Sequence, residues 1–326
     1  MDVSYNISNK SFSRYVVYRV GLDAGFFSEY NNMILAMAWC LRNRVQFKLF
    51  SKNANFGFNK GWQDYFEPFC SENTSEYHYR YNHRPLPFGK SKYYPFIVRK
   101  LIQHGFLDNN FNYLPPYSHL LKALNIGGLL TQDIFVKARS QDLEEIVELP
   151  EICYRGSVRN LCKYLTDITW RFNDDIRGEI ETLIETINLP EAYLGFHIRY
   201  GDKHVEFDQF PVEDYMRKAI SISALKKAFV LTDDYRVLDK LRNTYPDWQF
   251  VSLCQEHERG YFNDEFNKLE PNEKRIRYIR FFTSMVVLER ACHFIGTFSS
   301  NPGMFLGMRM LPEKCHGLDF ERWVIW

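Results

Sequence analysis

Apolar runs typical of strands alternate along this chain with apolar spacings typical of helices. In the first half, a β-branched run at residues 16–20 ends at a loop containing Gly21 and Gly25. A helical spacing at 33–41 and a second strand-like run at 45–50 follow. Strand, glycine-containing turn, helix and strand in this order open a βαβ unit, so the pattern predicts an α/β fold with parallel strands.

The second half repeats the alternation. An apolar run at 193–196 continues into the alternating residues His197, Ile198 and Arg199 and breaks at Gly201. Further strands are expected at 228–231, 248–251 and 293–296, and helices at 212–220, 235–245, 273–291 and 304–310. Parallel sheets of this kind bind ligands beyond the carboxyl ends of their strands.

The two halves are joined by a segment, residues 141–189, whose spacing predicts mostly helix, including 143–147 and 176–184, up to a stop at Pro190. A chain of 326 residues exceeds the usual size of one hydrophobic core. We therefore expect an N-terminal α/β domain at 1–190 and a C-terminal Rossmann-like domain at 191–326.

Composition narrows the class of partner. The formal net charge of +1 gives no electrostatic reason to expect a nucleic acid. Aromatic residues make up 17% of the chain, and residues 75–117 are dense in Tyr, His, Arg, Asn and Pro. Such a segment is either a face for a sugar, which stacks on aromatic rings, or a solvated loop covering the sheet.

The cysteines and the first residues bear on the compartment. The seven cysteines are scattered without CxxC spacing, which predicts free thiols in a reducing compartment rather than disulfides or a zinc site. The start of the chain lacks a secretory pattern, and no run approaches the ~18 apolar residues that span a bilayer. A cytoplasmic location without a transmembrane segment is expected.

The candidate chemistry lies where three predicted strands end. Arg199 follows one strand, residues 232–234 (Thr-Asp-Asp) follow another, and residues 297–301 precede a helix. The planar fork of an arginine matches two phosphate oxygens, and a helix start with hydroxyl residues offers further donors. Each feature alone also fits an ordinary strand end or an N-cap, but together they favour a nucleotide diphosphate. The chain has neither a GxxxxGK[ST] nor a GxGxxG motif.

These motifs, in this order and spacing, resemble the α-1,6-fucosyltransferases, a group that includes the core and the rhizobial nodulation fucosyltransferases. The resemblance rests on residues 195–203, 231–234 and 296–300, and it extends to 61–66, 245–246 and 316–319. It implies a GT-B-type architecture, in which two Rossmann-like domains face each other across a cleft and the C-terminal one holds the donor.

The resemblance also implies roles for individual residues. His197 would contact the nucleotide, Arg199 would bind the diphosphate, and Asp234 would lie at the edge of the donor or the acceptor. Thr297, Ser299 and Ser300 would complete the donor site at the phosphates. Lys203 and Glu206 match the family's pair near the acceptor hydroxyl, with Glu206 as the first candidate for the base and Arg199 and Lys203 as its catalytic partners.

One position departs from the family. Ser284 stands where the family has an aspartate that pairs with guanine, and a serine cannot accept two N–H bonds in the same way. The leading hypothesis is an inverting, metal-independent transferase that moves fucose from GDP-fucose to a glycan or glycolipid, with no cofactor. No DxD motif occurs in the chain, so no manganese site is expected. The alternatives are another nucleotide-sugar donor and a catalytically silent sugar- or nucleotide-binding protein.

Overall fold

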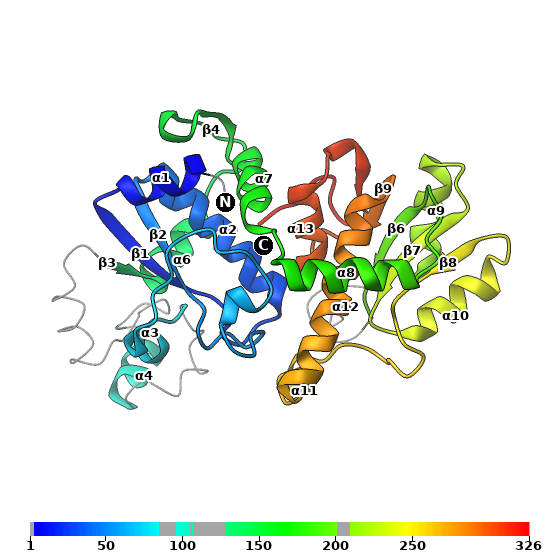
Figure 1. The fold of residues 1–326 in the computed structure, drawn as a ribbon, viewed down its shortest axis with the longest axis horizontal. Coiled ribbons are helices and arrows are strands. Elements are labelled where there is room, and N and C mark those ends of the chain that lie inside the picture. Colours follow the sequence, from blue (N-terminus) through cyan, green and yellow to red (C-terminus); the bar gives the residue numbers. More distant parts are fainter. Residues whose placement is uncertain (1–2, 85–95, 105, 107–127, 201–208, 326) are drawn as a thin grey trace.

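Two separate parallel sheets form the centres of the two halves of the molecule. The computed structural model describes residues 3–84, 96–104, 106, 128–200 and 209–325. Figure 1 shows the two sheets at opposite ends of the long axis, with helices from both halves between them. The α/β class expected from the sequence is confirmed, and among the described residues no helix is long and apolar enough to cross a membrane.

The N-terminal sheet is small. Its strands β1 (Arg14–Arg19), β2 (Val45–Phe50) and β3 (Gly128–Leu130) run parallel in the order β2-β1-β3. The helix that follows β1, α2 (Phe26–Arg42), is almost entirely buried, as the predicted βαβ unit requires. The other helices of this half are α1 (Val3–Ser11), α3 (Glu76–Tyr81), α4 (Phe96–Gln103) and α6 (Thr131–Arg139).

The C-terminal sheet has the strand order β10-β9-β6-β7-β8, and all its pairs are parallel. Its strands are β6 (Leu194–Ile198), β7 (Lys227–Thr232), β8 (Gln249–Val251), β9 (His293–Gly296) and β10 (Cys315–Gly317). Helices α9 (Val212–Ile222) and α10 (Tyr235–Thr244) pack on one face, and α12 (Pro271–Arg290) packs on the other. The remaining helices are α11 (Asn263–Phe266) and α13 (Asn301–Arg309). Every strand and helix predicted here is confirmed, whereas β10 and α11 were not predicted.

The connecting segment corrects one expectation. The helix expected at 143–147 is wrong, because residues 146–149 form strand β4 (Ile146–Leu149), antiparallel to β5 (Tyr154–Ser157). Exposed and buried residues alternate along β4, and Pro150 follows it directly, which disfavours helix in the residue before. Helices α7 (Val158–Thr169) and α8 (Asp174–Thr186) come next, and α8 confirms the helix predicted at 176–184.

The segment at 61–66 is built around one carboxylate. Asp64 accepts the backbone N–H groups of four consecutive residues, 58–61, at 2.7–2.9 Å. Gly61 has a φ of +71°, and a Cβ there would lie 1.9 Å from the Ser51 carbonyl oxygen, so only glycine fits. The loop thereby directs Tyr65 and Phe66 into the core, where both are fully buried.

The two halves share a single aromatic core. Phe282 on α12 lies with its ring centroid 4.9 Å from Phe26, 5.3 Å from Tyr65 and 5.7 Å from Trp170. Helix α13 also packs on α2 and α7, so helices of the second half lie on those of the first (Figure 1). The boundary near residue 190 stays a prediction. All seven cysteines are free, as expected.

Candidate active site

The carboxyl ends of three neighbouring strands form the candidate site. Strand β6 lies between β9 and β7, so the ends of the three strands are adjacent. His197 lies at the end of β6, Thr232 ends β7, and residues 297–300 follow β9. The polar residues that the sequence analysis placed at strand ends are therefore brought to one edge of one sheet.

His197 and Ser300 are the most closely joined of these residues. Both are buried, and His197 Nδ1 lies 3.3 Å from Ser300 Oγ. Ser300 is the N-cap of α13: its Oγ accepts the Gly303 N–H at 3.2 Å and donates to the Thr297 carbonyl at 2.7 Å. A Cβ at Gly303 would lie 2.0 Å from that carbonyl oxygen, so glycine permits the tight start of α13.

The backbone before α13 is already engaged by a carboxylate. Asp319, just after β10, accepts the Phe298 N–H through Oδ1 and the Ser299 N–H through Oδ2, both at 2.8 Å. These two amides therefore face Asp319. The single hydroxyl proton of Ser300 is used on the Thr297 carbonyl, so Ser300 could donate to a phosphate only after that bond breaks. The donor roles of Ser299 and Ser300 stay predictions. The sequence signal for Asp319 was its place in the motif at 316–319, which carried no role.

Arg199 is held between an acid and a ring. Its Nε lies 3.9 Å from Asp233 Oδ2, and its Cζ lies 5.5 Å from the centroid of the Tyr261 ring. Asp233 also accepts the backbone N–H groups of Tyr200 at 2.8 Å and Tyr261 at 3.1 Å. Asp233 thus ties the end of β6 to the segment at 261. Sequence reasoning placed Asp233 among the polar residues at the strand ends without giving it a role, and it did not identify Tyr261.

Asp234, which was expected at the donor or the acceptor edge, caps a helix. Its Oδ1 accepts the Arg236 N–H at 3.0 Å, and its carboxylate pairs with the Arg236 guanidinium, with Nε at 3.0 and 3.1 Å. The Arg236 hydrogen bond holds the pKa of the Asp234 carboxyl below its ordinary value. The residue is 1% exposed. Its part in donor or acceptor binding stays a prediction, and the carboxylate beside Arg199 is that of Asp233.

The remaining positions singled out from the sequence are Ser284, Lys203 and Glu206. Ser284 lies on α12, is 3% exposed and donates its hydroxyl to the Arg280 carbonyl at 2.9 Å. Lys203 and Glu206 lie outside the described residues, so their catalytic roles stay predictions. Among the residues that the structure does describe, no three His, Cys, Asp or Glu side chains gather as a metal site would require.

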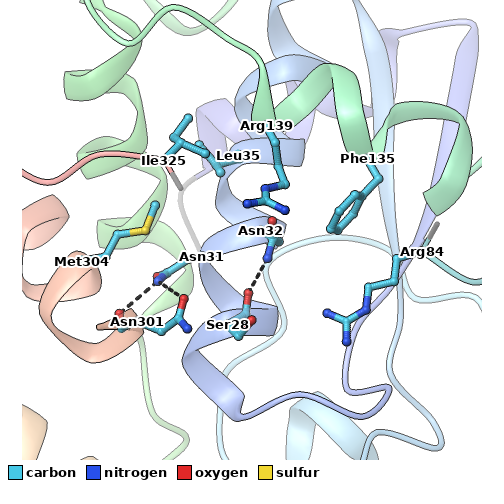
Figure 2. A pocket seen from close by; sticks show the side chains of 10 residues that line it. All are labelled: Ser28, Asn31, Asn32, Leu35, Arg84, Phe135, Arg139, Asn301, Met304 and Ile325. Atoms are coloured by element: carbon cyan, nitrogen blue, oxygen red, sulfur yellow. Dashed lines mark hydrogen bonds between the residues drawn. The ribbon is translucent and has the colours of Figure 1, made fainter. Parts of the chain in front are cut away.

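A cavity of about 180 Å³ lies beside this edge of the sheet, between α2, α6 and α13 (Figure 2). Asn301, which follows Ser300, belongs to its wall, and Asn31 on α2 donates to the Asn301 carbonyl at 3.0 Å. The cavity is lined by Ser28, Asn31, Asn32, Leu35, Arg84, Phe135, Arg139, Asn301, Met304 and Ile325. Sequence analysis missed it, because its wall comes from segments far apart in the chain.

Two Rossmann-like halves joined through α12 and α13, with polar strand ends at one edge, define the GT-B type of fold. A crystal structure of NodZ α-1,6-fucosyltransferase soaked with GDP-fucose has this fold, with a TM-score of 0.50 and 14% identity over 91% of this chain and 92% of that one. NodZ from Bradyrhizobium in a second crystal structure gives a TM-score of 0.49 at 14% identity, covering 91% and 93% of the two chains. POFUT1 in complex with GDP gives 0.48 at 14% identity, covering 93% and 97%.

The first of these similarities confirms the predicted fold, which agrees with the resemblance seen in the motifs. No protein-family model matches the sequence, and a search of curated proteins returns no match either.

Proposed function

We propose that this protein is an inverting, metal-independent glycosyltransferase that moves fucose from GDP-fucose to a hydroxyl of a glycan or glycolipid. The observation that carries the proposal is the meeting of His197, Ser300 and Arg199 at the ends of adjacent parallel strands. The chain that carries these residues has the fold of NodZ, an α-1,6-fucosyltransferase whose crystals were soaked with GDP-fucose.

The proposed reaction is a single displacement. The acceptor oxygen forms a bond to C1 of the sugar while the bond from C1 to the diphosphate oxygen breaks, and the acceptor proton passes to a base. Glu206 is the first candidate for that base, and Lys203 is its expected catalytic partner. Negative charge grows on the departing diphosphate, and a guanidinium stabilises such charge without a metal ion. Arg199 takes this role, with its direction set by Asp233 and Tyr261.

We assign the two halves of the chain to the two substrates. The candidates for donor binding, which include Thr297, Ser299 and Asp234, all lie in residues 191–326. We therefore assign this half to the nucleotide sugar. The half at 1–190 is assigned to the acceptor, because α2 and α6 line the cavity next to Asn301. In this assignment the aromatic segment at 75–117 belongs to the acceptor side.

A second donor remains a specific alternative. Because residue 284 is a serine, this position offers no carboxylate to a guanine base, and its hydroxyl proton is donated to the Arg280 carbonyl. A nucleotide panel separates the alternatives, since a ligand that binds only the folded protein raises its melting temperature. GDP is expected to raise the melting temperature and UDP is not. A rise with UDP, CDP or ADP but not with GDP would show that the donor carries another nucleotide.

The activity itself is tested by turnover of GDP-fucose, measured as GDP release with and without glycan acceptors. We expect transfer to continue in excess EDTA, because Arg199 provides the positive charge. Loss of turnover in chelator, restored by Mn²⁺, would contradict the metal-free mechanism. Binding of GDP-fucose with no turnover on any acceptor would instead favour a silent sugar-binding protein.

A further inference from the structure

The cavity beside Asn301 is lined by both apolar and polar side chains. Phe135, Leu35 and Met304 are apolar, and Ser28, Asn32 and Asn301 contribute polar groups. A pyranose ring is mixed in the same way, with C–H faces that stack on aromatic rings and hydroxyls at its edge. At about 180 Å³ the cavity is smaller than the roughly 300–1,000 Å³ of pockets for drug-sized ligands, and so it suits one sugar unit.

Charge in the lining is of one sign. Among the lining residues that the structure describes, Arg84 and Arg139 carry charge and none is acidic. Figure 2 shows the two guanidinium groups extending from different segments toward Asn32 and Ser28 on α2. A guanidinium binds a carboxylate or a phosphate through two parallel hydrogen bonds, and two of them in one small cavity favour an anion.

The acids near Arg84 lie outside the lining. Asp23 pairs with Arg84 from a position 66% exposed to solvent, and Glu29 Oε1 lies 3.7 Å from the guanidinium. Burial raises the pKa of the Glu29 carboxyl above its ordinary value although Arg84 opposes this shift. The contacts with these two acids restrict the Arg84 side chain, which reduces the entropy lost when it binds a ligand.

An unpaired acceptor atom completes the lining. Asn31 is 2% exposed, and its Oδ1 has no hydrogen-bond partner among the described residues. The orientation of this amide is fixed, because its Nδ2 donates to the Asn301 carbonyl at 3.0 Å. A buried oxygen without a donor costs free energy, and a sugar hydroxyl is a donor of the right kind.

We propose that this cavity is an acceptor subsite for an anionic sugar unit, bound through Arg84 and Arg139 at its acidic group and through Asn31 at a hydroxyl. The inference rests on the proposed function, because it places the acceptor beside the donor residues that precede Asn301. It goes beyond that function by naming the chemistry of the acceptor: an acidic sugar, such as a uronic acid, rather than a neutral one.

The test measures binding without donor, so that it does not depend on transfer. Methyl β-glucoside, methyl β-glucuronide and glucose 6-phosphate are titrated into the full chain by ligand-observed NMR. We expect at least one acidic sugar to bind about tenfold more tightly than the glucoside. The two acidic arms distinguish a carboxylate from a phosphate.

The variants locate the site. Arg84→Gln and Arg139→Gln should each remove most of this preference. Arg42→Gln should keep it, because Arg42 is also ion-paired and its side chain is 19% exposed against 20% for Arg84, but it lies outside the cavity. Asn31→Leu should weaken all the sugars that bind without changing the preference for charge.

Three outcomes overturn the proposal: equal binding of neutral and acidic sugars, a preference that persists in both cavity variants, or full competition by inorganic phosphate alone. GDP affinity is measured in the same samples. If the protein fails to bind GDP but prefers acidic sugars in a way that depends on Arg84, the subsite proposal stands and the proposed function does not. If it binds GDP but shows no such preference, the proposed function stands and the subsite proposal does not.

Discussion

The acidic pair that follows β7 divides between the candidate site and the fold. Asp233 lies beside Arg199 and binds two backbone amides, whereas Asp234 caps α10 and pairs with Arg236. The two residues are adjacent, and successive side chains point to opposite sides of an extended chain. A sequence motif that contains both therefore carries one residue for the site and one for stability.

Replacing Asp234 by alanine tests this division. Loss of the N-cap and of the ion pair should cost about 1–2 kcal/mol of unfolding free energy at neutral pH, while GDP affinity stays unchanged. Because Arg236 lowers the Asp234 pKa in the folded state, the stabilisation is complete above the ordinary pKa and is lost as pH falls through the lowered one.

The difference in melting temperature between parent and Asp234→Ala should therefore shrink in acid below about pH 4. Asp214→Ala is the control, since Asp214 pairs with Arg217 at the surface of α9 at 2.8 Å and should cost less. A large loss of GDP affinity in Asp234→Ala would show that Asp234 contributes to donor binding.

Arg199 and Glu206 should be separable by kinetics. Arg199→Ala is expected to weaken GDP binding by about 2–3 kcal/mol and to slow transfer, because the guanidinium contacts charge in the ground state and in the transition state. Glu206→Gln should leave GDP affinity nearly unchanged and lower kcat by roughly 10²–10⁴.

Calorimetry with GDP beside initial transfer rates measures both effects, and Arg217→Ala on the surface of α9 is the control for loss of an exposed arginine. Parental rates in Glu206→Gln would show that another group takes the acceptor proton. Lys203→Ala follows either pattern according to whether the lysine touches the phosphate or tunes the acid.

At the scale of elements, the start of α13 is held by residues from other strands. Asp319 after β10 binds the Phe298 and Ser299 amides, and His197 of β6 lies against Ser300. Gly303 lets the first turn approach Thr297. The geometry of the hydroxyls at this helix start therefore depends on a carboxylate that need not touch the donor at all.

Asp319→Ala should lower both stability and GDP affinity, because two backbone donors lose their acceptor and the loop before α13 relaxes. Asp319→Asn, with one oxygen, should fall between parent and alanine. Thermal unfolding and GDP calorimetry measure the two effects together. Glu321→Ala, at an exposed position two residues on, is the matched control and should change neither. An unchanged GDP affinity in Asp319→Ala would show that Asp319 stabilises the fold without affecting donor binding.

The sequence predicted most strands and helices because their apolar spacing matches their burial. In β6 all five residues are buried, and the continuous apolar run before His197 predicts this burial. The segment at 143–147 misled, because Leu143, Ile146 and Val147 have helical spacing although Ile146 is exposed in a hairpin strand. Strand β10, with three residues, is too short to leave a period.

The candidate site was predicted as far as strand ends allow. His197, Arg199 and Ser300 could be placed together, since parallel strands bring their carboxyl ends to one edge. Tertiary contacts decide the rest: Tyr261 reaches Arg199 from a loop, and Asp319 reaches the amides before α13. The cavity at Asn31 and Arg139 joins segments more than a hundred residues apart, which no local pattern reports.

At the scale of the whole molecule, the two sheets are coupled through one core. The aromatic cluster that contains Phe282 also contains Phe26 and Tyr65, so α12 of the second half packs into the first. The polar contact between Asn31 and Asn301 lies at the same junction. By contrast, the second cluster, between β6, β7, α9 and α10, belongs to the C-terminal half alone.

Phe282→Ala should therefore destabilise both halves at once. Phe282 is fully buried, and deletion of its ring should cost about 3–5 kcal/mol. Hydrogen exchange followed by mass spectrometry should show faster exchange in β1 and in β7 alike, because opening the shared core exposes both sheets. Val230→Ala is the control: its neighbours come from residues 194–295, so faster exchange should concentrate in β7 and spread less to β1. If Phe282→Ala affected β7 alone, or unfolding split into two separate transitions, the halves would be independent domains, and the aromatic cluster would be a contact between them rather than a common core.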